Sequence, residues 1–545
     1  MKKFLILAMV LAVGLSYAEN HAKYVIICAD ALYDSILPLA EWKQATGLST
    51  RVIKLSTIGN DTAKLKSFVR DSCYNSGPVQ PEYILLVGSP SNLPARFYPR
   101  QHGGYAYSSD NIYGDVTGNY QMEIPVGRFP ASNTTQLGIM VAKTLMYEKT
   151  PDLTDNLWMR RLTTIVREGG SSDDTIYWGN IRNAAQKAAA AGFVHCDSLS
   201  SNRGDNSTDV MNSCNAGTGF VLYRGSAQNT WYPPFDQVQP GHLTATNKLP
   251  IVCSITCQTM TLDPTDPAML GDSWMRAGTT SNLRGGVAFF GNTHPANEVA
   301  RQRGAVARGF FDGLFSENIW KLGKTALRAK HQLYVEFPTD TSDYRGFSLL
   351  GDPDLGIWTA TPRILYVLHP ADILPDSQQL HVTVRYSFNY TPVESALVCA
   401  SMGTAVYATG YTDSTGAIDL TVNPPDTGSL RLVVTGQNLY PYDTYIRVGA
   451  SAVAQPVPAR PAGAYGLTAT PAVFTKTCRL AWNPALADPA HLSLYDAQGR
   501  LVFSQPVRTS PLSLSTSSLP SGVYLAVLHD QSGRALGRTR ITKLN

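Results

Sequence analysis

The chain has 545 residues, enough for two to four domains, and its composition is typical of a soluble globular protein. The formal net charge is +4 at neutral pH, and no dense run of lysine and arginine occurs. Composition and charge therefore give no reason to expect nucleic acid or an anionic membrane surface as a partner.

The first 18 residues have the layout of a secretory signal. Two lysines at 2–3 precede an apolar stretch at 4–15, and Ser-Tyr-Ala at 16–18 is a plausible cleavage site. A membrane anchor is the alternative, but the stretch is shorter than the roughly 20 residues that a span needs. We therefore predict a signal peptide at 1–18, a mature chain without a transmembrane segment, and a secreted or cell-surface protein.

Residues 19–361 are predicted to form an α/β domain. Its strands are expected at 24–27, 83–87, 162–166, 220–223, 251–254 and 287–290, with helices at 33–46 and from an N-cap at Ser132 to about Tyr147. Short apolar strands that alternate with helices indicate a mostly parallel sheet covered on both faces. In such sheets the functional groups lie at the carboxyl ends of the strands.

The pattern changes after Trp358. Residues 362–450 contain β-branched runs and turn residues with little helical periodicity, which predicts a small β-sandwich. Residues 451–466 are rich in proline and alanine, as a linker would be. Residues 467–545 form a second β-rich module, with strand-like runs at 492–495 and 501–503.

Two segments at predicted strand ends could carry chemistry. Cys257 follows the strand at 251–254, and Arg224 and Gly225 follow the strand at 220–223. A cysteine there could act as a nucleophile, and a glycine N–H could donate to an oxyanion, although a strand-end cysteine can also be a small buried hydrophobe. Cys253 and Cys257 complete no zinc pattern, because no second cysteine or histidine pair lies at suitable spacing.

A set of short segments in fixed order resembles the gingipain family of secreted cysteine peptidases, which have a caspase-like α/β fold. The resemblance covers about residues 24–358, and the order and spacing of its parts are more specific than any single part. The matching segments are 83–88 (YILLVG), 109–115 (SDNIYGD), 124–129 (IPVGRF), 168–170 (EGG), 225–226 (GS), 249–252 (LPIV), 285–291 (GGVAFFG) and 350–355 (LGDPDL).

The resemblance implies roles for four residues. The family nucleophile is the cysteine after the Leu-Pro strand, which falls on Cys257, and the oxyanion N–H falls on Gly225. The family base is a histidine in a Gly-His-Gly-Ser loop, where this chain has Arg224 instead. The acid that orients the histidine falls on Glu168. The nucleophile and the acid are thus present and the base is not.

Two further departures leave substrate preference open. Ser89 stands where the family has an aspartate after the strand glycine, and Gly179 falls near the acidic group that gives some members a preference for basic residues. Arg128 is expected to be an ion-pair residue rather than a substrate clamp.

Arginine cannot act as the general base in place of histidine. A guanidinium stays protonated, with a pKa above about 12, and has no acceptor site. Arg224 could hold a Cys257 thiolate electrostatically, and an ion pair with Glu168 would weaken that effect. Losing acid–base help costs on the order of 10²–10⁴ in rate. The sequence therefore predicts weak or absent peptide hydrolysis.

Other polar residues suggest two additional roles. His242 and His294 follow the strands of the site region and could substitute for the base, although an ordinary surface or loop histidine is the favoured interpretation of each. Asp110, Asp115 and Asp352 lie in oxygen-rich loops that could hold structural Ca²⁺, although turn capping is the favoured interpretation. No cofactor is expected to be required for the chemistry.

The two C-terminal modules also resemble parts of secreted peptidases. Residues 362–450 resemble the immunoglobulin-like domain that follows gingipain catalytic domains. The last module resembles a type IX secretion sorting domain at 482–484 (WNP), 494–496 (LYD), 499–500 (GR), 519–524 (LPSGVY) and the basic end at 538–543. This resemblance implies a two-membrane bacterium, the type IX secretion machinery as a partner, and possible removal of the tail. A generic adhesive β-sandwich is the alternative.

Three functions remain open at this point. The first is a secreted cysteine peptidase that acts on proteins or peptides. The second is a pseudopeptidase that binds protein at the cell surface. The third is a thiol-dependent activity other than hydrolysis. Arg224 argues against the first function, the secreted cysteine peptidase.

Overall fold

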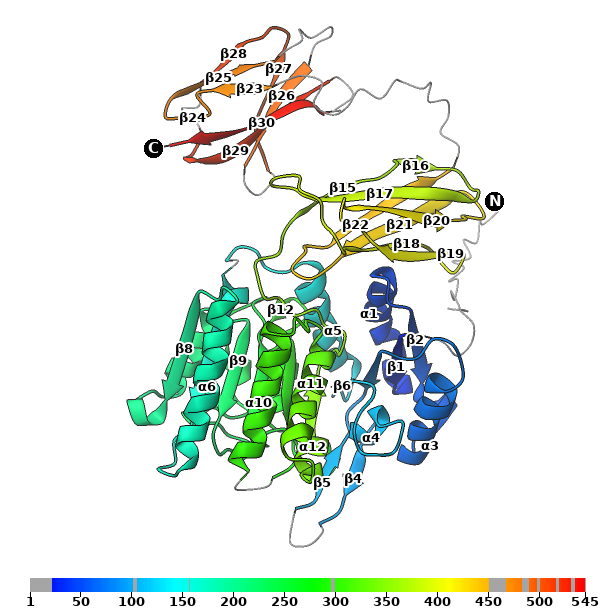
Figure 1. Ribbon diagram of the computed structural model, residues 1–545, viewed down its shortest axis with the longest axis vertical. Coiled ribbons are helices and arrows are strands. Elements are labelled where there is room, and N and C mark those ends of the chain that lie inside the picture. The colour runs from blue at the N-terminus through cyan, green and yellow to red at the C-terminus, as the bar shows by residue number, and fades with distance from the viewer. Residues whose placement is uncertain are drawn as a thin grey trace, which may run out of the picture. The chain divides into compact units, whose positions relative to one another are not determined.

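The computed structural model describes residues 22–100, 105–155, 157–295, 299–449, 467–482, 490–496, 500–515, 519–530 and 535–544 (Figure 1). The chain divides into two compact units, Met1–Ala450 and Ser451–Asn545. The predicted signal peptide at 1–18 and the predicted linker at 451–466 lie outside the described residues.

A ten-stranded sheet forms the centre of the first unit (Figure 1). Neighbouring strands are parallel except for β13 and β14, which confirms the predicted mostly parallel sheet. The order is β2 (Thr50–Lys54), β1 (Tyr24–Cys28), β3 (Tyr83–Val87), β6 (Val126–Phe129), β14 (Phe347–Leu350), β13 (Ala288–Asn292), β10 (Ile251–Gln258), β9 (Phe220–Arg224), β7 (Arg161–Val166) and β8 (His195–Ser200).

Helices bury both faces of this sheet, and inner strands such as β3 are therefore rich in apolar residues. On one face lie α6 (Asp173–Ala190), α10 (Ala300–Phe315) and α11 (Leu322–Glu336), which stand in front of the sheet in Figure 1. The other face packs against α1 (Tyr33–Ala45), α5 (Thr134–Lys149), α7 (Ser207–Asn215) and α9 (Leu270–Arg276).

Two predicted boundaries differ from the structure for reasons that the contacts show. Strand β10 does not end at residue 254 but continues through Cys257 to Gln258, which pairs with Asn292 of β13. Helix α5 is capped by Asn133 rather than by Ser132, because the Asn133 side chain accepts a hydrogen bond from the backbone N–H of Gln136 at 3.0 Å.

Residues 365–448 form two further sheets around one apolar core. One sheet has β15 (Leu365–Leu368), β17 (Gln378–Tyr386) and β20 (Ala417–Val422). The other has β16 (Asp372–Ile373), β22 (Tyr442–Val448), β21 (Gly428–Thr435), β18 (Leu397–Met402) and β19 (Val406–Tyr411). The strand-rich character agrees with the sequence, and the immunoglobulin-like assignment stays a prediction.

The end of α1 joins the α/β body to these sheets. Trp42 and Ala45 of α1 pack against Val433 of β21 in a small buried cluster. Lys149 Nζ lies 5.1 Å from the Trp42 ring centroid and 3.0 Å from Asp443 Oδ2 of β22. Apolar packing and an ion pair therefore hold the two parts of the first unit together.

The second unit is also all β. One sheet has β23 (Thr468–Thr470), β25 (Thr477–Ala481) and β28 (Leu512–Ser515), and the other has β24 (Val473–Phe474), β30 (Ala535–Lys543), β29 (Gly522–His529), β26 (Ala490–Tyr495) and β27 (Leu501–Val507). Its role as a sorting domain stays a prediction. Among the helices that the structure describes, none combines the length and the hydrophobicity needed to span a bilayer.

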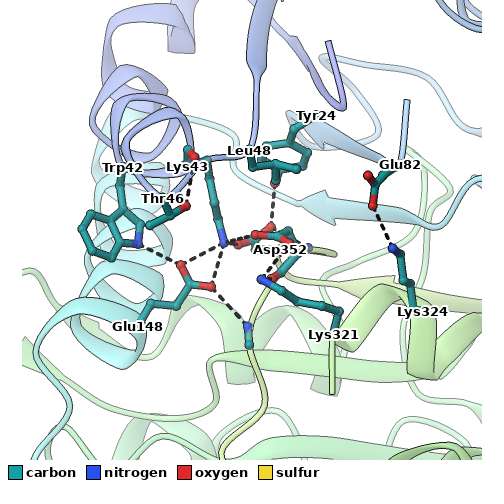
Figure 2. A network of polar contacts seen from close by, with 12 residues as sticks. Tyr24, Trp42, Lys43, Thr46, Leu48, Glu82, Glu148, Lys321, Lys324 and Asp352 are labelled. Carbon is teal, nitrogen blue, oxygen red and sulfur yellow. Dashed lines mark hydrogen bonds and ion pairs between the residues drawn. The ribbon is translucent and has the colours of Figure 1, made fainter. Parts of the chain in front are cut away.

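A buried ammonium group ties three segments of the first unit together (Figure 2). Lys43 Nζ of α1 lies 2.7 Å from Glu148 Oε1 of α5, 2.6 Å from Asp352 Oδ2 and 3.0 Å from Asp354 Oδ2. The Tyr24 hydroxyl donates to Asp352 Oδ1 at 2.6 Å. Burial alone would lower the pKa of Lys43, but the three carboxylates raise it well above its ordinary value.

Lys143 is a second buried lysine, with a different environment. Its Nζ donates to the carbonyl oxygens of Trp274 and Met275 at 3.0 and 2.8 Å. The ion pairs of the described residues include none that involves Lys143. Burial lowers the pKa of Lys143 to about 7.

The Lys143→Met variant should gain stability in a pH-dependent way. Because the folded-state pKa of Lys143 is about 7 and the unfolded value is higher, the unfolded chain binds the extra proton between these values. The wild-type lysine therefore costs most stability below pH 7. Urea unfolding should show a gain that is larger at pH 6 than at pH 9 by on the order of 2 kcal/mol. An equal change at both pH values would contradict this assignment.

Candidate functional site

Cys257 and Arg224 lie on the same face of the sheet. Side chains alternate between the two faces along a strand. Alternate residues of β9 and β10 pack in one apolar cluster with α6 and α10, namely Phe220, Leu222, Ile251, Cys253 and Ile255. Cys257 and Arg224 continue these two alternations at the carboxyl ends of their strands, as the sequence predicted for functional groups.

The sulfur of Cys257 contacts an arginine that the sequence analysis did not single out. Nη1 of Arg303, from α10, lies 2.9 Å from Cys257 Sγ, and the two residues are 4% and 7% exposed, respectively. Arg303 also binds Asp343 of α12 (Thr341–Gly346), with Nε 3.0 Å from Oδ2 and Nη2 3.2 Å from Oδ1. Burial lowers the pKa of Arg303, but Asp343 and Cys257 shift it upward overall.

Asp343 organises this cluster from a fully buried position. Besides Arg303, its Oδ1 lies 3.0 Å from His294 Nδ1 and accepts from Asn292 Nδ2 at 2.9 Å. Burial would raise the pKa of Asp343, but Arg303 and His294 hold it at about 2. Asp343 is therefore an ionised carboxylate at neutral pH that fixes the position of Arg303.

Among the described residues, the partners of Arg224 are all neutral groups. Its Nε donates to Asn180 Oδ1 at 3.0 Å, Nη1 to the Ile255 carbonyl at 2.5 Å and Nη2 to the Ala300 carbonyl at 2.9 Å. The guanidinium also lies 5.0 Å from the Tyr177 ring centroid. Burial lowers the pKa of Arg224 to about 10. Arg224 therefore links β10, α6 and the start of α10.

Glu168 has other partners than expected. Its Oε1 accepts from Trp178 Nε1 at 2.7 Å, and its Oε2 accepts from the Ser200 hydroxyl. The hydrogen bonds and ion pairs of the described residues include none between Glu168 and Arg224 or between Arg224 and Cys257. The expected ion pair between Arg224 and Glu168 was therefore wrong, because each side chain is satisfied by neutral partners.

Gly225 occupies a position that only glycine fits. Its φ is +145°, and a Cβ there would lie 2.6 Å from Arg167 Cβ. The Gly225 carbonyl accepts from Thr256 Oγ1 at 2.5 Å, which holds the loop against β10. The oxyanion role of its N–H stays a prediction.

The two histidines considered as substitute bases differ in position. His242 is exposed at the end of α8 (Gln239–His242). His294 is 7% exposed, and its ring centroid lies 4.8 Å from that of Tyr107. Within the described chain no hydrogen bond joins either histidine to Cys257, so His294 is linked to the sulfur through Asp343 and Arg303.

The three aspartates named for Ca²⁺ lie in separate networks. Asp110 forms a two-bond ion pair with Arg128 at 2.6 and 2.7 Å, which agrees with the ion-pair role expected for that arginine. Asp115 accepts from two backbone N–H groups, and Asp352 binds Lys43. Within the described residues no group of three or more His, Cys, Asp or Glu side chains could hold a metal ion. The Ca²⁺ assignment stays a prediction.

Comparisons with known proteins agree with this geometry. Residues 17–358 match the family model described as peptidase family C25. Gingipain R2 of Porphyromonas gingivalis is 24% identical over 521 residues, which cover 89% of this chain and 64% of the relative. Lys-gingipain HG66 of the same organism is 22% identical over 467 residues, which cover 80% and 26%. This chain thus spans less than two thirds of the length of these curated relatives.

Solved structures show the same fold. The Arg-specific cysteine proteinase gingipain R superposes with a TM-score of 0.70 at 21% identity, covering 79% of this chain and 99% of that one. A complex of the pro- and mature domains of a gingipain from Porphyromonas gingivalis gives 0.69 at 20% identity, with 78% and 100% covered. The chain therefore has a gingipain-like fold with a large, mostly parallel sheet.

Proposed function

Since this chain belongs to peptidase family C25, we propose that it is an exported protein that binds peptide segments at its Cys257 site without hydrolysing them efficiently. Family membership supports protein or peptide as the bound partner. The loss of hydrolysis is supported by one observation: Arg224, which the family resemblance aligns with the base, is buried and donates all its described hydrogen bonds to neutral groups.

The two proton transfers that hydrolysis requires explain why this arrangement hydrolyses peptides poorly. A cysteine peptidase removes the thiol proton and then returns a proton to the leaving amine. The guanidinium groups of Arg224 and Arg303 have no acceptor and are very weak acids. They can do neither task, and the expected loss in rate is on the order of 10²–10⁴.

The chain ends support export in the same proposal. The signal-like residues 1–18 and the sorting-like residues 467–545 together favour transport to the cell surface or medium through type IX secretion machinery. Fractionation of the native host tests this part. Recovery of the full-length chain from the cytoplasm alone would contradict it.

Purified protein with a broad peptide library, read by mass spectrometry, tests the enzymatic part. We expect no cleavage that depends on Cys257, so that the parent and Cys257→Ala give the same products. Arg224→His should create cleavage if the rest of the site is competent. Arg224→Gln is its matched control, because it also loses bonds to Ile255 and Ala300 but adds no base.

Peptide retention measures the binding part in the same samples. Library peptides should be held by immobilised parent and by Cys257→Ala alike. Efficient cleavage by the parent that Cys257→Ala abolishes would overturn the proposal, and so would the absence of any retained peptide.

A further inference from the structure

We propose that Arg303 holds Cys257 as a thiolate that reacts with small hydroperoxides, which gives this chain a thiol chemistry independent of the missing histidine. This inference goes beyond the proposed function, because it concerns the charge state of the sulfur and holds whether or not a peptide is bound.

The charges around the sulfur favour the thiolate form of Cys257. Arg303 is 4% exposed and is balanced by the fully buried Asp343. Arg224 brings a second positive charge, at 1% exposure, and has no carboxylate partner among the residues that the structure describes. A buried charge without a counter-charge is unfavourable. A thiolate at Cys257 adds a negative charge 2.9 Å from Arg303 Nη1, on the same face of the sheet as Arg224.

The position of the sulfur limits the reagent. Cys257 is 7% exposed, so a bulky disulfide or folded protein cannot approach the sulfur closely in this conformation. A hydroperoxide is small, and its oxygens can accept hydrogen bonds from guanidinium N–H groups. Arg303 is positioned to donate such a bond beside the sulfur that it already contacts.

The reaction balances without a general base. The thiolate sulfur attacks one oxygen of hydrogen peroxide, and an S–O bond forms as the O–O bond breaks. The departing hydroxide takes a proton from solvent, so the products are Cys257 sulfenic acid and water. Sulfur is oxidised by two electrons and the peroxide is reduced. Because the attacking group in this step is the thiolate, the step needs no histidine to remove a proton.

Cys196 provides an internal comparison. It is half-buried and more accessible than Cys257, and its Sγ donates to the Asp197 carbonyl at 3.7 Å. Burial raises the pKa of the Cys196 thiol. If accessibility decided reactivity, Cys196 would react first. If the guanidinium contact decides it, Cys257 reacts first.

The test treats the full chain with hydrogen peroxide, traps sulfenic acid with dimedone and measures labelling of each cysteine by peptide mass spectrometry. We expect Cys257 to be labelled at least about tenfold faster than Cys196, as expected for a thiolate beside a cation. Arg303→Gln should slow labelling of Cys257 by about tenfold or more. Labelling of Cys196 first, or an unchanged rate in folded Arg303→Gln, would overturn the proposal.

Two further variants distinguish a loss of the contact with the sulfur from a general effect on folding. Arg303→Lys keeps a positive charge for Asp343 but loses the planar fork that reaches both the carboxylate and the sulfur, so it should fold and still label slowly. Arg308→Gln changes another arginine of α10, which pairs with Glu336, and should label like the parent. Parent-like labelling in Arg303→Lys and Arg303→Gln together would contradict the role of Arg303. Peptide cleavage by the parent would contradict the proposed function but would not change the labelling rates. The two proposals can therefore be refuted independently.

Discussion

Lys43→Met is expected to lower the free energy of unfolding by about 3–5 kcal/mol, the range for breaking a buried ion pair on one side. Lys43 is 1% exposed and neutralises Glu148, Asp352 and Asp354 from distances of 3.0 Å or less. Methionine fills similar volume but leaves these carboxylates without their shared cation. Asp354 retains Lys321 at 2.8 Å, whereas the remaining partners of Asp352 among the described residues are neutral donors.

Urea unfolding at neutral pH measures this effect, with Lys324→Met as the matched control. Lys324 also pairs with a carboxylate, Glu82 at 2.8 Å, but its side chain is 45% exposed. Exposed pairs contribute roughly 0–1 kcal/mol, so the control should lose little stability. Equal losses in the two variants would show that the buried cluster contributes no more to the free energy of unfolding than an exposed ion pair does.

Asp343→Ala is expected to cost about 3–5 kcal/mol as well, because it leaves Arg303 buried without its carboxylate. The folded-state pKa of Asp343 is about 2, below the ordinary value for an aspartate. Its stabilisation is therefore fully present above about pH 4 and is lost only as the pH falls through about 2. The difference between variant and parent should be the same at pH 5 and pH 8.

Asp312→Ala is the control for Asp343→Ala. Asp312 lies on α10 and pairs with Lys187, but both side chains are more than a quarter exposed. Its loss should stay below about 1 kcal/mol. A loss in Asp343→Ala that grows markedly between pH 5 and pH 8 would mean that another group titrates with the site.

The sheet could be predicted because buried parallel strands are rich in apolar residues. Strand β3 has the predicted bounds of 83–87, and its five residues are all buried. Strand β10 was ended too early because Thr256 and Gln258 interrupt the apolar run near its end. The strand nevertheless continues past a shift in register, as the pairing of Gln258 with Asn292 shows.

The site was only partly accessible from sequence. Cys257 and Arg224 follow apolar strands, so their place at a sheet edge could be argued. The contact between Cys257 and Arg303 joins residues 46 apart in the chain and depends on how α10 packs. A signal did exist, since Arg303 falls on the helical stripe that includes Val306, Ala307 and Phe310. An arginine on an apolar stripe is a candidate for a buried charge.

The contacts of Trp42 determine where this chain can be shortened. Trp42 is 3% exposed because β21 covers it, and Val433 opposite it is 1% exposed. A protein that stops at residue 361 would present that indole and the neighbouring Ala45 to solvent, on the helix that also carries Lys43. Stopping at residue 450 keeps the cover in place. The peptidase-like body and the sheets after it are therefore best produced as one piece for the experiments above.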